Sequence, residues 1–140
     1  MSNVAELINS AKTALGIEFG STRIKAILID YDGHVLASGS HEWENKLING
    51  VWTYDLADVD AGLKSCYSSL RKDIESKYGV TPKKFGAIGI SAMMHGYIAL
   101  DSQDKQLAPF QTWRNTNTTE SADFLTERSV EHTSELQSHL

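Results

Sequence analysis

The chain contains a short polar turn whose residues could bind a phosphate group. Gly20, Ser21 and Thr22 separate two apolar runs, and two such runs around a glycine-containing turn predict a β-hairpin. The tip of this hairpin would offer backbone N–H groups and two hydroxyls, and Lys25 would add an ammonium group. So many donors in a small space indicate an anion-binding site.

Glu18 precedes this turn by two residues. A carboxylate beside a phosphate is unfavourable unless a cation lies between them, and carboxylate and phosphate oxygens together bridge hard divalent cations. Glu18 therefore indicates a Mg²⁺ site. A motif this short is equally typical of a plain hairpin that binds no ligand, so both interpretations stay open at this point.

A second group of candidate binding residues follows a later apolar run. Met94 and His95 come soon after residues 85–90, and ligand-binding groups in open α/β sheets gather just past the carboxyl ends of the strands. A lone histidine after a strand is more often structural, and Met93 and Met94 beside it are also compatible with a hydrophobic core. The position of His95 makes it a candidate, with the structural role as its alternative.

The elements that would position these residues follow the order βββαβ. They are strands at 13–19, 23–30 and 35–39, a helix at 55–78 and a strand at 85–90. The Asp-Gly pair at 32–33 predicts a second hairpin, so the first three strands should be antiparallel. A strand that follows a crossover helix should run parallel to its neighbour. The predicted fold class is α/β with a mixed sheet, and the apolar second strand is expected to be covered on both faces.

Several residues outside the motifs are expected to support the core. In the long helix, Asp55 is the predicted N-cap and Gly79 the predicted C-terminal residue. Its apolar positions are Leu56, Val59, Leu63, Cys66, Tyr67, Leu70, Ile74 and Tyr78. Cys66 is expected to be a small buried group rather than a nucleophile, and Trp43 and Trp52 to cover a core edge rather than stack on a ligand. A later helix from about Thr118 should bury Ala122, Phe124 and Leu125.

The composition is that of one globular domain. The chain has 140 residues, of which 41% are hydrophobic and 22% charged. A net charge of −5 argues against a nucleic-acid partner or an anionic membrane surface, because both require clustered Lys and Arg. Neither a secretory signal nor an apolar run of about 20 residues is visible, so a cytoplasmic location is expected. No P-loop motif occurs.

The polar turn and the later motifs together resemble the FGGY family of carbohydrate kinases, within the actin-like ATPase superfamily. The family usually has Asp at the position of Glu18 and a Thr-rich turn where this chain has Gly20-Ser21-Thr22. The segment at 94–96, Met-His-Gly, is similar to the sugar-contacting segment of xylulokinase-like members. Those members usually have Gln where this chain has Met93.

A third segment, at 112–118, resembles the family's Trp-x-Asp-x-Arg-Thr motif. Asn115 stands in place of the usual Asp and Asn117 in place of the usual Arg. The resemblance makes Trp113, Arg114 and Asn115 substrate-binding candidates together with Met94 and His95. A tryptophan face suits the C–H side of a sugar, while amides and imidazole can fix its hydroxyls.

The resemblance implies that the γ-phosphoryl group of ATP is transferred to a sugar or polyol hydroxyl. Glu18 would hold Mg²⁺, and the phosphate-binding residues would be Gly20, Ser21, Thr22 and Lys25. The expected fold is part of an actin-like ATPase (ribonuclease H-like) domain, in an enzyme that could form a homodimer. The alternative is a non-catalytic actin-like ATPase or sugar-binding regulator.

The resemblance also implies that this chain is an N-terminal fragment. The catalytic base, an Asp in the family, and the adenosine pocket are expected beyond Leu140, so the fragment itself is expected to be inactive. Residues 1–12 are assigned as an extension and 13–127 as the partial kinase domain. Residues 128–140 resemble a translated sequencing adapter, which predicts a non-native tail; a natural polar helix end is the alternative.

Overall fold

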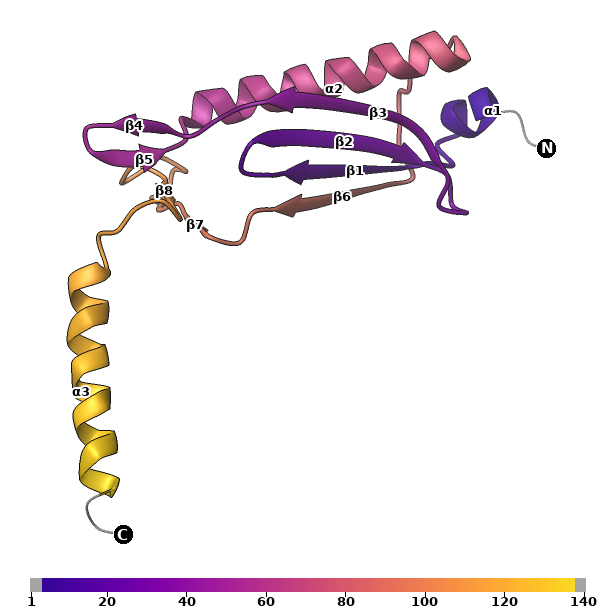
Figure 1. Ribbon diagram of the computed structural model, residues 1–140. Coiled ribbons are helices and arrows are strands. Elements are labelled where there is room, and N and C mark those ends of the chain that lie inside the picture. Colours follow the sequence, from indigo (N-terminus) through magenta and orange to yellow (C-terminus); the bar gives the residue numbers. More distant parts are fainter. Residues whose placement is uncertain (1–3, 138–140) are drawn as a thin grey trace.

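A four-stranded mixed sheet covered on one face by a long helix forms the body of the protein (Figure 1). The computed structural model describes residues 4–137, with side chains described as far as Ser129. The sheet strands are β1 (Ala14–Phe19), β2 (Arg23–Ile29), β3 (Val35–Glu42) and β6 (Ala87–Ala92), and the covering helix is α2 (Leu56–Tyr78). The predicted α/β class is confirmed, and so is the βββαβ order for the main sheet and α2; the hairpin of β4 (Lys46–Ile48) and β5 (Val51–Thr53), which lies between β3 and α2 in the chain, was not predicted.

The strand order in the sheet is β3-β2-β1-β6. β1 pairs antiparallel with β2, and β2 pairs antiparallel with β3, whereas β6 pairs parallel with β1. The third strand is longer than predicted, because its pairing with β2 continues to the pair Arg23 and Glu42. The parallel strand begins at Ala87 rather than Phe85.

Helix α2 begins and ends at the predicted residues. The Asp55 carboxylate accepts a hydrogen bond from the Ala57 N–H at 2.8 Å, as an N-cap does. Gly79 adopts the left-handed conformation (φ 65°), and its N–H donates to the Glu75 carbonyl at 2.9 Å. A glycine at this position ends the helix without steric cost.

The hydrophobic core lies between α2 and the sheet. Its buried residues are Ile8, Leu15, Ile24, Ala26, Leu28, Leu36, Ala37, Cys66, Leu70 and Ile74. Burial raises the pKa of the Cys66 thiol, which suits a packing role and confirms the expectation for this residue. Ile8 belongs to helix α1 (Val4–Asn9), so the N-terminal extension contributes to the core.

The opposite face of the sheet is open among the described residues, so the prediction that β2 is covered on both faces is wrong for this chain. Side chains of β2 alternate between the faces, and Lys25 and Ile27 point away from α2. Ile27 is 40% exposed on this face. Ile88 and Ile90 of β6 are 60% and 69% exposed on the α2 face of the sheet, because α2 packs on β3 and β2 and leaves β6 uncovered. Helix α2 can cover only one face.

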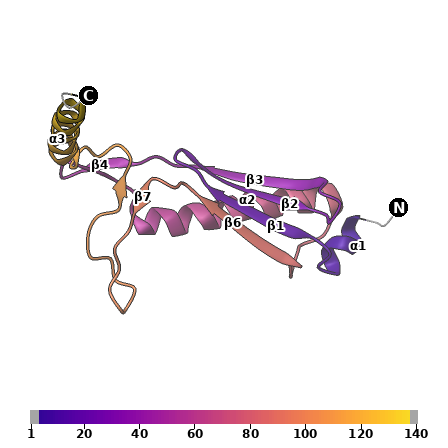
Figure 2. The same ribbon diagram turned by 90° about the horizontal axis from the view of Figure 1, so that it is seen from below.

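Helix α3 (Thr119–Gln137) projects away from the sheet (Figures 1 and 2). A helix near this position was predicted, but the predicted burial of Ala122, Phe124 and Leu125 is wrong. All three are exposed, Phe124 and Leu125 by 57% and 63%, because no described element lies against this helix. The proposed non-native tail overlaps its second half and also includes residues outside the described range, and it stays a prediction. None of the described helices combines the length and hydropathy needed to cross a membrane.

Candidate functional site

The hairpin turn between β1 and β2 directs its carbonyl groups into the protein. The Gly20 carbonyl accepts a hydrogen bond from the Trp43 indole N–H at 2.8 Å, and the Ser21 carbonyl accepts one from the Tyr54 hydroxyl at 2.5 Å. The Thr22 carbonyl accepts from the Trp43 backbone N–H at 3.1 Å. The three acceptors of the turn are therefore already occupied.

The donors of Ser21 and Thr22 in the same turn remain available, whereas the Gly20 N–H donates to the Arg23 carbonyl at 3.0 Å. The N–H groups and hydroxyls of Ser21 and Thr22 make no hydrogen bond within the described part of the chain, and both residues are exposed. Gly20 is required here, since a Cβ atom at this position would lie 2.9 Å from the Arg23 carbonyl oxygen. A turn with free donors and occupied acceptors is suited to an anion.

Glu18 and Lys25 lie side by side next to this turn on the open face of the sheet. They are paired across β1 and β2, with Lys25 Nζ 3.4 Å from Glu18 Oε2 and both side chains 53% exposed. An exposed pair at this distance contributes at most about 1 kcal/mol. Either partner can therefore exchange this contact for a ligand.

Glu18 fits a magnesium site as one ligand among several. It is the only carboxylate lining a shallow depression of about 520 Å³, which is formed by Gly16, Ile17, Glu18, Lys25, Ile27, Gly89, Ile90 and Ser91. Mg²⁺ usually keeps several waters and takes one or two carboxylates together with substrate phosphates. Ser91 was not predicted as a site residue; it joins Glu18 because the parallel register pairs them.

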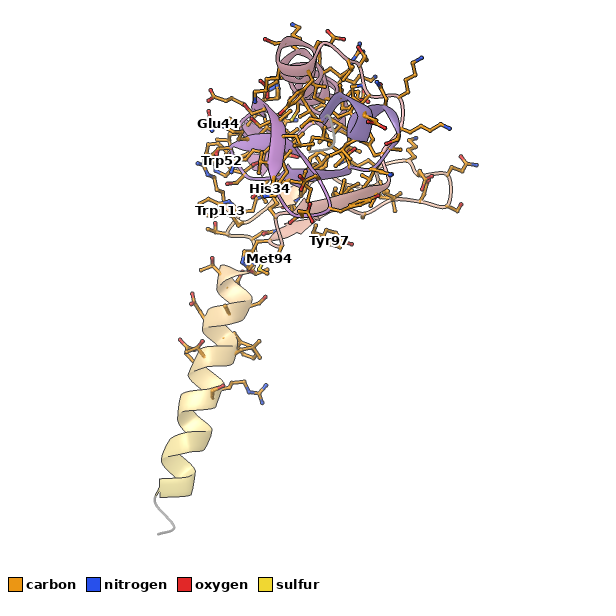
Figure 3. The ribbon with its side chains drawn as sticks, turned by 90° about the vertical axis from the view of Figure 1, so that its right-hand side faces the viewer. His34, Glu44, Trp52, Met94, Tyr97 and Trp113 are labelled. Atoms are coloured by element: carbon orange, nitrogen blue, oxygen red, sulfur yellow. The ribbon has the colours of Figure 1, made fainter. Side chains whose placement is uncertain are left out.

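The two predicted acceptor segments meet in a small ladder. β7 (Gly96–Tyr97) pairs with β8 (Gln111–Thr112), and Gly96 lies opposite Thr112. His95 and Trp113 thus flank one ladder, which we call the acceptor wall (residues 94–97 and 111–115). Met94 is 84% and Trp113 60% exposed, and Figure 3 shows both at the surface of the body.

Arg114 and Asn115 occupy different places in the acceptor wall. The Asn115 amide donates to the Trp52 carbonyl at 2.7 Å and accepts from the Trp52 N–H at 2.8 Å. It therefore ties the wall to β5 (Val51–Thr53), which pairs with β4 (Lys46–Ile48). Because both ends of the amide are used, Asn115 is better placed to position the wall than to contact substrate.

The Arg114 guanidinium lies over two indole rings. Its central carbon is 4.9 Å from the Trp52 ring centroid and 5.5 Å from that of Trp113, and Figure 3 shows both indoles on the same flank. Within residues 4–129 this guanidinium has no acidic partner. Trp43 packs against the core, as predicted, whereas Trp52 lies at the acceptor wall.

A third polar cluster occupies the turn between β2 and β3, where the sequence analysis indicated no site. Ligand atoms of Asp30, Asp32 and His34 lie within 4.8 Å of one another. The Asp30 carboxylate accepts hydrogen bonds from the N–H groups of Asp32 and His34 at 3.0 and 2.9 Å, and lies 3.0 Å from His34 Nδ1. These bonds order the turn by themselves.

The His34 imidazole is expected to titrate above its ordinary pKa of 6.5, because it hydrogen-bonds the Asp30 carboxylate and is attracted by its charge. The raised pKa stabilises the fold at pH values below 6.5, and this contribution is lost as the pH rises through the folded-state pKa. NMR titration should show the His34 pKa falling toward 6.5 in Asp30→Asn. Asp32→Asn should change it less, since Asp32 acts by charge alone; equal effects would contradict the assignment.

Comparisons with known proteins identify the family of the chain. The chain matches the FGGY family of carbohydrate kinases, N-terminal domain, over residues 13–139. It is 27% identical over 121 residues to the xylulose kinase of Bacillus subtilis (strain 168), covering 86% of this chain and 24% of that protein. The gluconokinase of the same strain is 28% identical over 103 residues, covering 71% of this chain and 18% of the relative.

Solved structures show the same fold. The crystal structure of a xylulose kinase from Brucella ovis superimposes with a TM-score of 0.68 at 24% identity, covering 84% of this chain and 24% of that one. Plasmodium falciparum glycerol kinase with ADP gives 0.65 at 23% identity, covering 84% and 23%. The fold is thus the predicted part of an actin-like ATPase fold. The chain spans about a quarter or less of the length of these proteins, and it belongs to the FGGY family of carbohydrate kinases.

Proposed function

We propose that this chain is the N-terminal part of a kinase that transfers the γ-phosphoryl group of ATP to a hydroxyl of a sugar or polyol. The observation that carries the proposal is the turn whose three carbonyls are occupied while the donors of Ser21 and Thr22 are free. Family membership supports it, since the relatives are named as xylulose kinases and a gluconokinase.

The residues divide into two functional groups in this proposal. The donors of Ser21 and Thr22, with Lys25, bind phosphate, while Gly20 shapes the turn and its N–H donates to the Arg23 carbonyl at 3.0 Å. Glu18 holds Mg²⁺ directly or through water. When bound there, Mg²⁺ would neutralise charge on the transferring phosphoryl group. The exposed side chains of the acceptor wall bind the sugar by stacking and hydrogen bonding.

The direct test is a comparison of phosphoryl transfer by this chain and by a full-length enzyme that contains it. Assayed against pentuloses, hexuloses, aldonates and polyols, the full-length enzyme should consume ATP only with its own acceptor. If it hydrolyses ATP without any acceptor dependence, the alternative of a non-catalytic actin-like ATPase is supported instead.

The 140-residue chain alone is expected to phosphorylate none of these acceptors. Positioning and electrostatic enclosure supply most of phosphoryl-transfer catalysis, and this chain corresponds to 24% of the length of its xylulose kinase relative. Removing residues 128–140 should change neither the activity nor the midpoint of urea unfolding. Acceptor-dependent turnover by the chain, with or without residues 128–140, would overturn the fragment assignment. A large loss of stability on removing these residues would contradict the prediction that they are a non-native tail.

Trp113→Ala and His95→Ala are expected to weaken acceptor binding in the full-length enzyme by up to about tenfold each, because single neutral contacts contribute about 1 kcal/mol. Calorimetry with the accepted sugar measures this effect. His34→Ala is the matched control, since His34 lies in the β2–β3 turn and should leave affinity unchanged. Unchanged sugar affinity in both variants would contradict the sugar-binding role of the acceptor wall.

A further inference from the structure

A column of aromatic rings connects the hairpin turn at residues 20–22, which we call the phosphate turn, to the acceptor wall. The aromatic column consists of Phe19, Trp43, Tyr54 and Phe110, and successive ring centroids are 6.3, 4.5 and 5.5 Å apart. Tyr54 is 3% and Phe110 7% exposed. The column therefore starts at the end of β1 and reaches the residue directly before β8.

Two members of this column hold the turn through polar atoms. The Trp43 indole N–H donates to the Gly20 carbonyl and the Tyr54 hydroxyl to the Ser21 carbonyl. In a trans peptide the carbonyl and the following N–H point in opposite directions. Drawing these two carbonyls inward therefore turns the N–H groups of Ser21 and Thr22 outward, where an anion would lie.

The chemistry of Tyr54 suits a permanent donor. Burial of the ring raises the pKa of its phenol above the ordinary value of 10.0, against smaller opposing effects of the Asn45 amide and the Arg114 charge. The hydroxyl thus keeps its proton throughout the physiological range. A donor at this point also prevents the Ser21 carbonyl from turning toward a phosphate, which it would repel.

The far end of the column supports the acceptor wall. A Cβ atom on Gly96 would lie 2.6 Å from Phe110 Cε2, so the phenyl ring packs directly against the backbone of β7. The phosphate turn and the wall are thus supported by the same group of rings. Displacement of that group would move both surfaces.

We propose that Trp43 and Tyr54 are positioning residues, which keep the phosphate turn with its donors outward and fix its place relative to the acceptor wall. This inference rests on the proposed function in that it takes the ligand of the turn to be phosphate. The competing explanation is that these rings only fill the core. Variants that keep an aromatic ring but lose the hydrogen-bond donor separate the two explanations.

The test uses the 140-residue chain and the conservative variants Tyr54→Phe and Trp43→Phe, which remove one donor each and retain an aromatic ring. Tyr78→Phe is the matched control, because the Tyr78 hydroxyl donates to the Leu36 carbonyl at 2.9 Å on another part of the sheet. It loses the same kind of hydrogen bond without touching the turn. Urea unfolding should show similar small losses of stability in Tyr54→Phe and Tyr78→Phe.

NMR measurements then separate positioning from packing. Without ligand, the heteronuclear NOE values of the Ser21 and Thr22 amides should fall in Tyr54→Phe and Trp43→Phe and stay unchanged in Tyr78→Phe. On titration with inorganic phosphate, the apparent Kd measured from these amides should rise about fivefold in the two turn variants, as expected for one lost hydrogen bond. In the unmodified chain the Trp43 indole N–H signal should shift with the same Kd.

The outcomes distinguish the inference from the proposed function. If phosphate moves no amide of the turn in the unmodified chain, the phosphate role is wrong, while the NOE values still decide whether Trp43 and Tyr54 order the turn. If phosphate binds but Tyr54→Phe and Tyr78→Phe have equal Kd and NOE values, the positioning role is wrong and the function stands. Phe110→Leu should lower the NOE values of both Ser21 and Tyr97; a change at Tyr97 alone would overturn the link between the two surfaces.

Discussion

Glu18→Gln is expected to lower the kcat of a full-length kinase carrying this domain by about 100- to 1,000-fold, with little change in sugar affinity. The amide keeps the size of the side chain but removes the negative charge that would hold Mg²⁺ beside the phosphate turn. Glu18 lies on the open face of the sheet, and its ion pair with Lys25 is long at 3.4 Å and half-exposed. The carboxylate is therefore available to a metal.

Steady-state kinetics at several Mg²⁺ concentrations measure this effect. The loss should fall mainly on kcat, and added Mg²⁺ should restore part of it, because a metal held by Glu18 would act on the transferring phosphoryl group rather than on the acceptor. Glu42→Gln is the matched control: Glu42 pairs with Arg23 on the exposed surface at 2.8 Å, and such pairs contribute little. A loss of sugar affinity with unchanged kcat would refute the metal role of Glu18.

Gly39→Ala is expected to destabilise the chain by about 3 kcal/mol or more. Gly39 lies in β3 directly under α2, where a Cβ atom would come within 2.3 Å of the Leu70 nitrogen and 2.6 Å of the Cys66 carbonyl oxygen. Both are backbone atoms of the helix, so no rotamer change can relieve the overlap. The helix would have to move away from the sheet and expose the core.

Gly89→Ala supplies the matched control for this stability prediction. Gly89 also lies in a strand of the same sheet, but nothing occupies the space within 4 Å of its missing Cβ atom. Its substitution should change the free energy of unfolding by less than about 0.5 kcal/mol. Urea unfolding followed by circular dichroism compares the two variants, and equal stabilities would show that α2 does not approach β3 as closely as the structure has it.

Helix α2 covers its own face of the sheet unevenly, closely over β3 and β2 but not over β6. Helix α2 packs so closely on β3 and β2 that glycine is required beneath it, whereas Ile88 and Ile90 of β6 lie exposed at 60% and 69%. Exposed apolar strands of this kind favour association. The isolated chain should therefore self-associate as its concentration rises, so experiments on it alone are best done at low concentration.

Local signals in the sequence were sufficient for the main sheet, for α2 and for the identity of the motifs, but not for the β4–β5 hairpin. Asp55 and Gly79 predicted both ends of α2 because capping depends on neighbouring backbone groups. The apolar runs and the two polar turns between them predicted the antiparallel strands, and the crossover helix predicted the parallel one. The order of the three motifs was enough to indicate the family, which the comparisons confirm.

Contacts between distant segments were decided only by the tertiary structure. The spacing of apolar residues shows which face of an element is apolar but not whether another element covers that face. The open sheet face and the exposed Phe124 were therefore not foreseen. Likewise, no local rule connects Tyr54 with a turn 33 residues earlier or the Asn115 amide with a strand 63 residues earlier. The sequence determined which groups are present at the candidate site. Which of them hold the site and which remain free for a ligand depends on hydrogen bonds and ring contacts that form only when these segments are packed together.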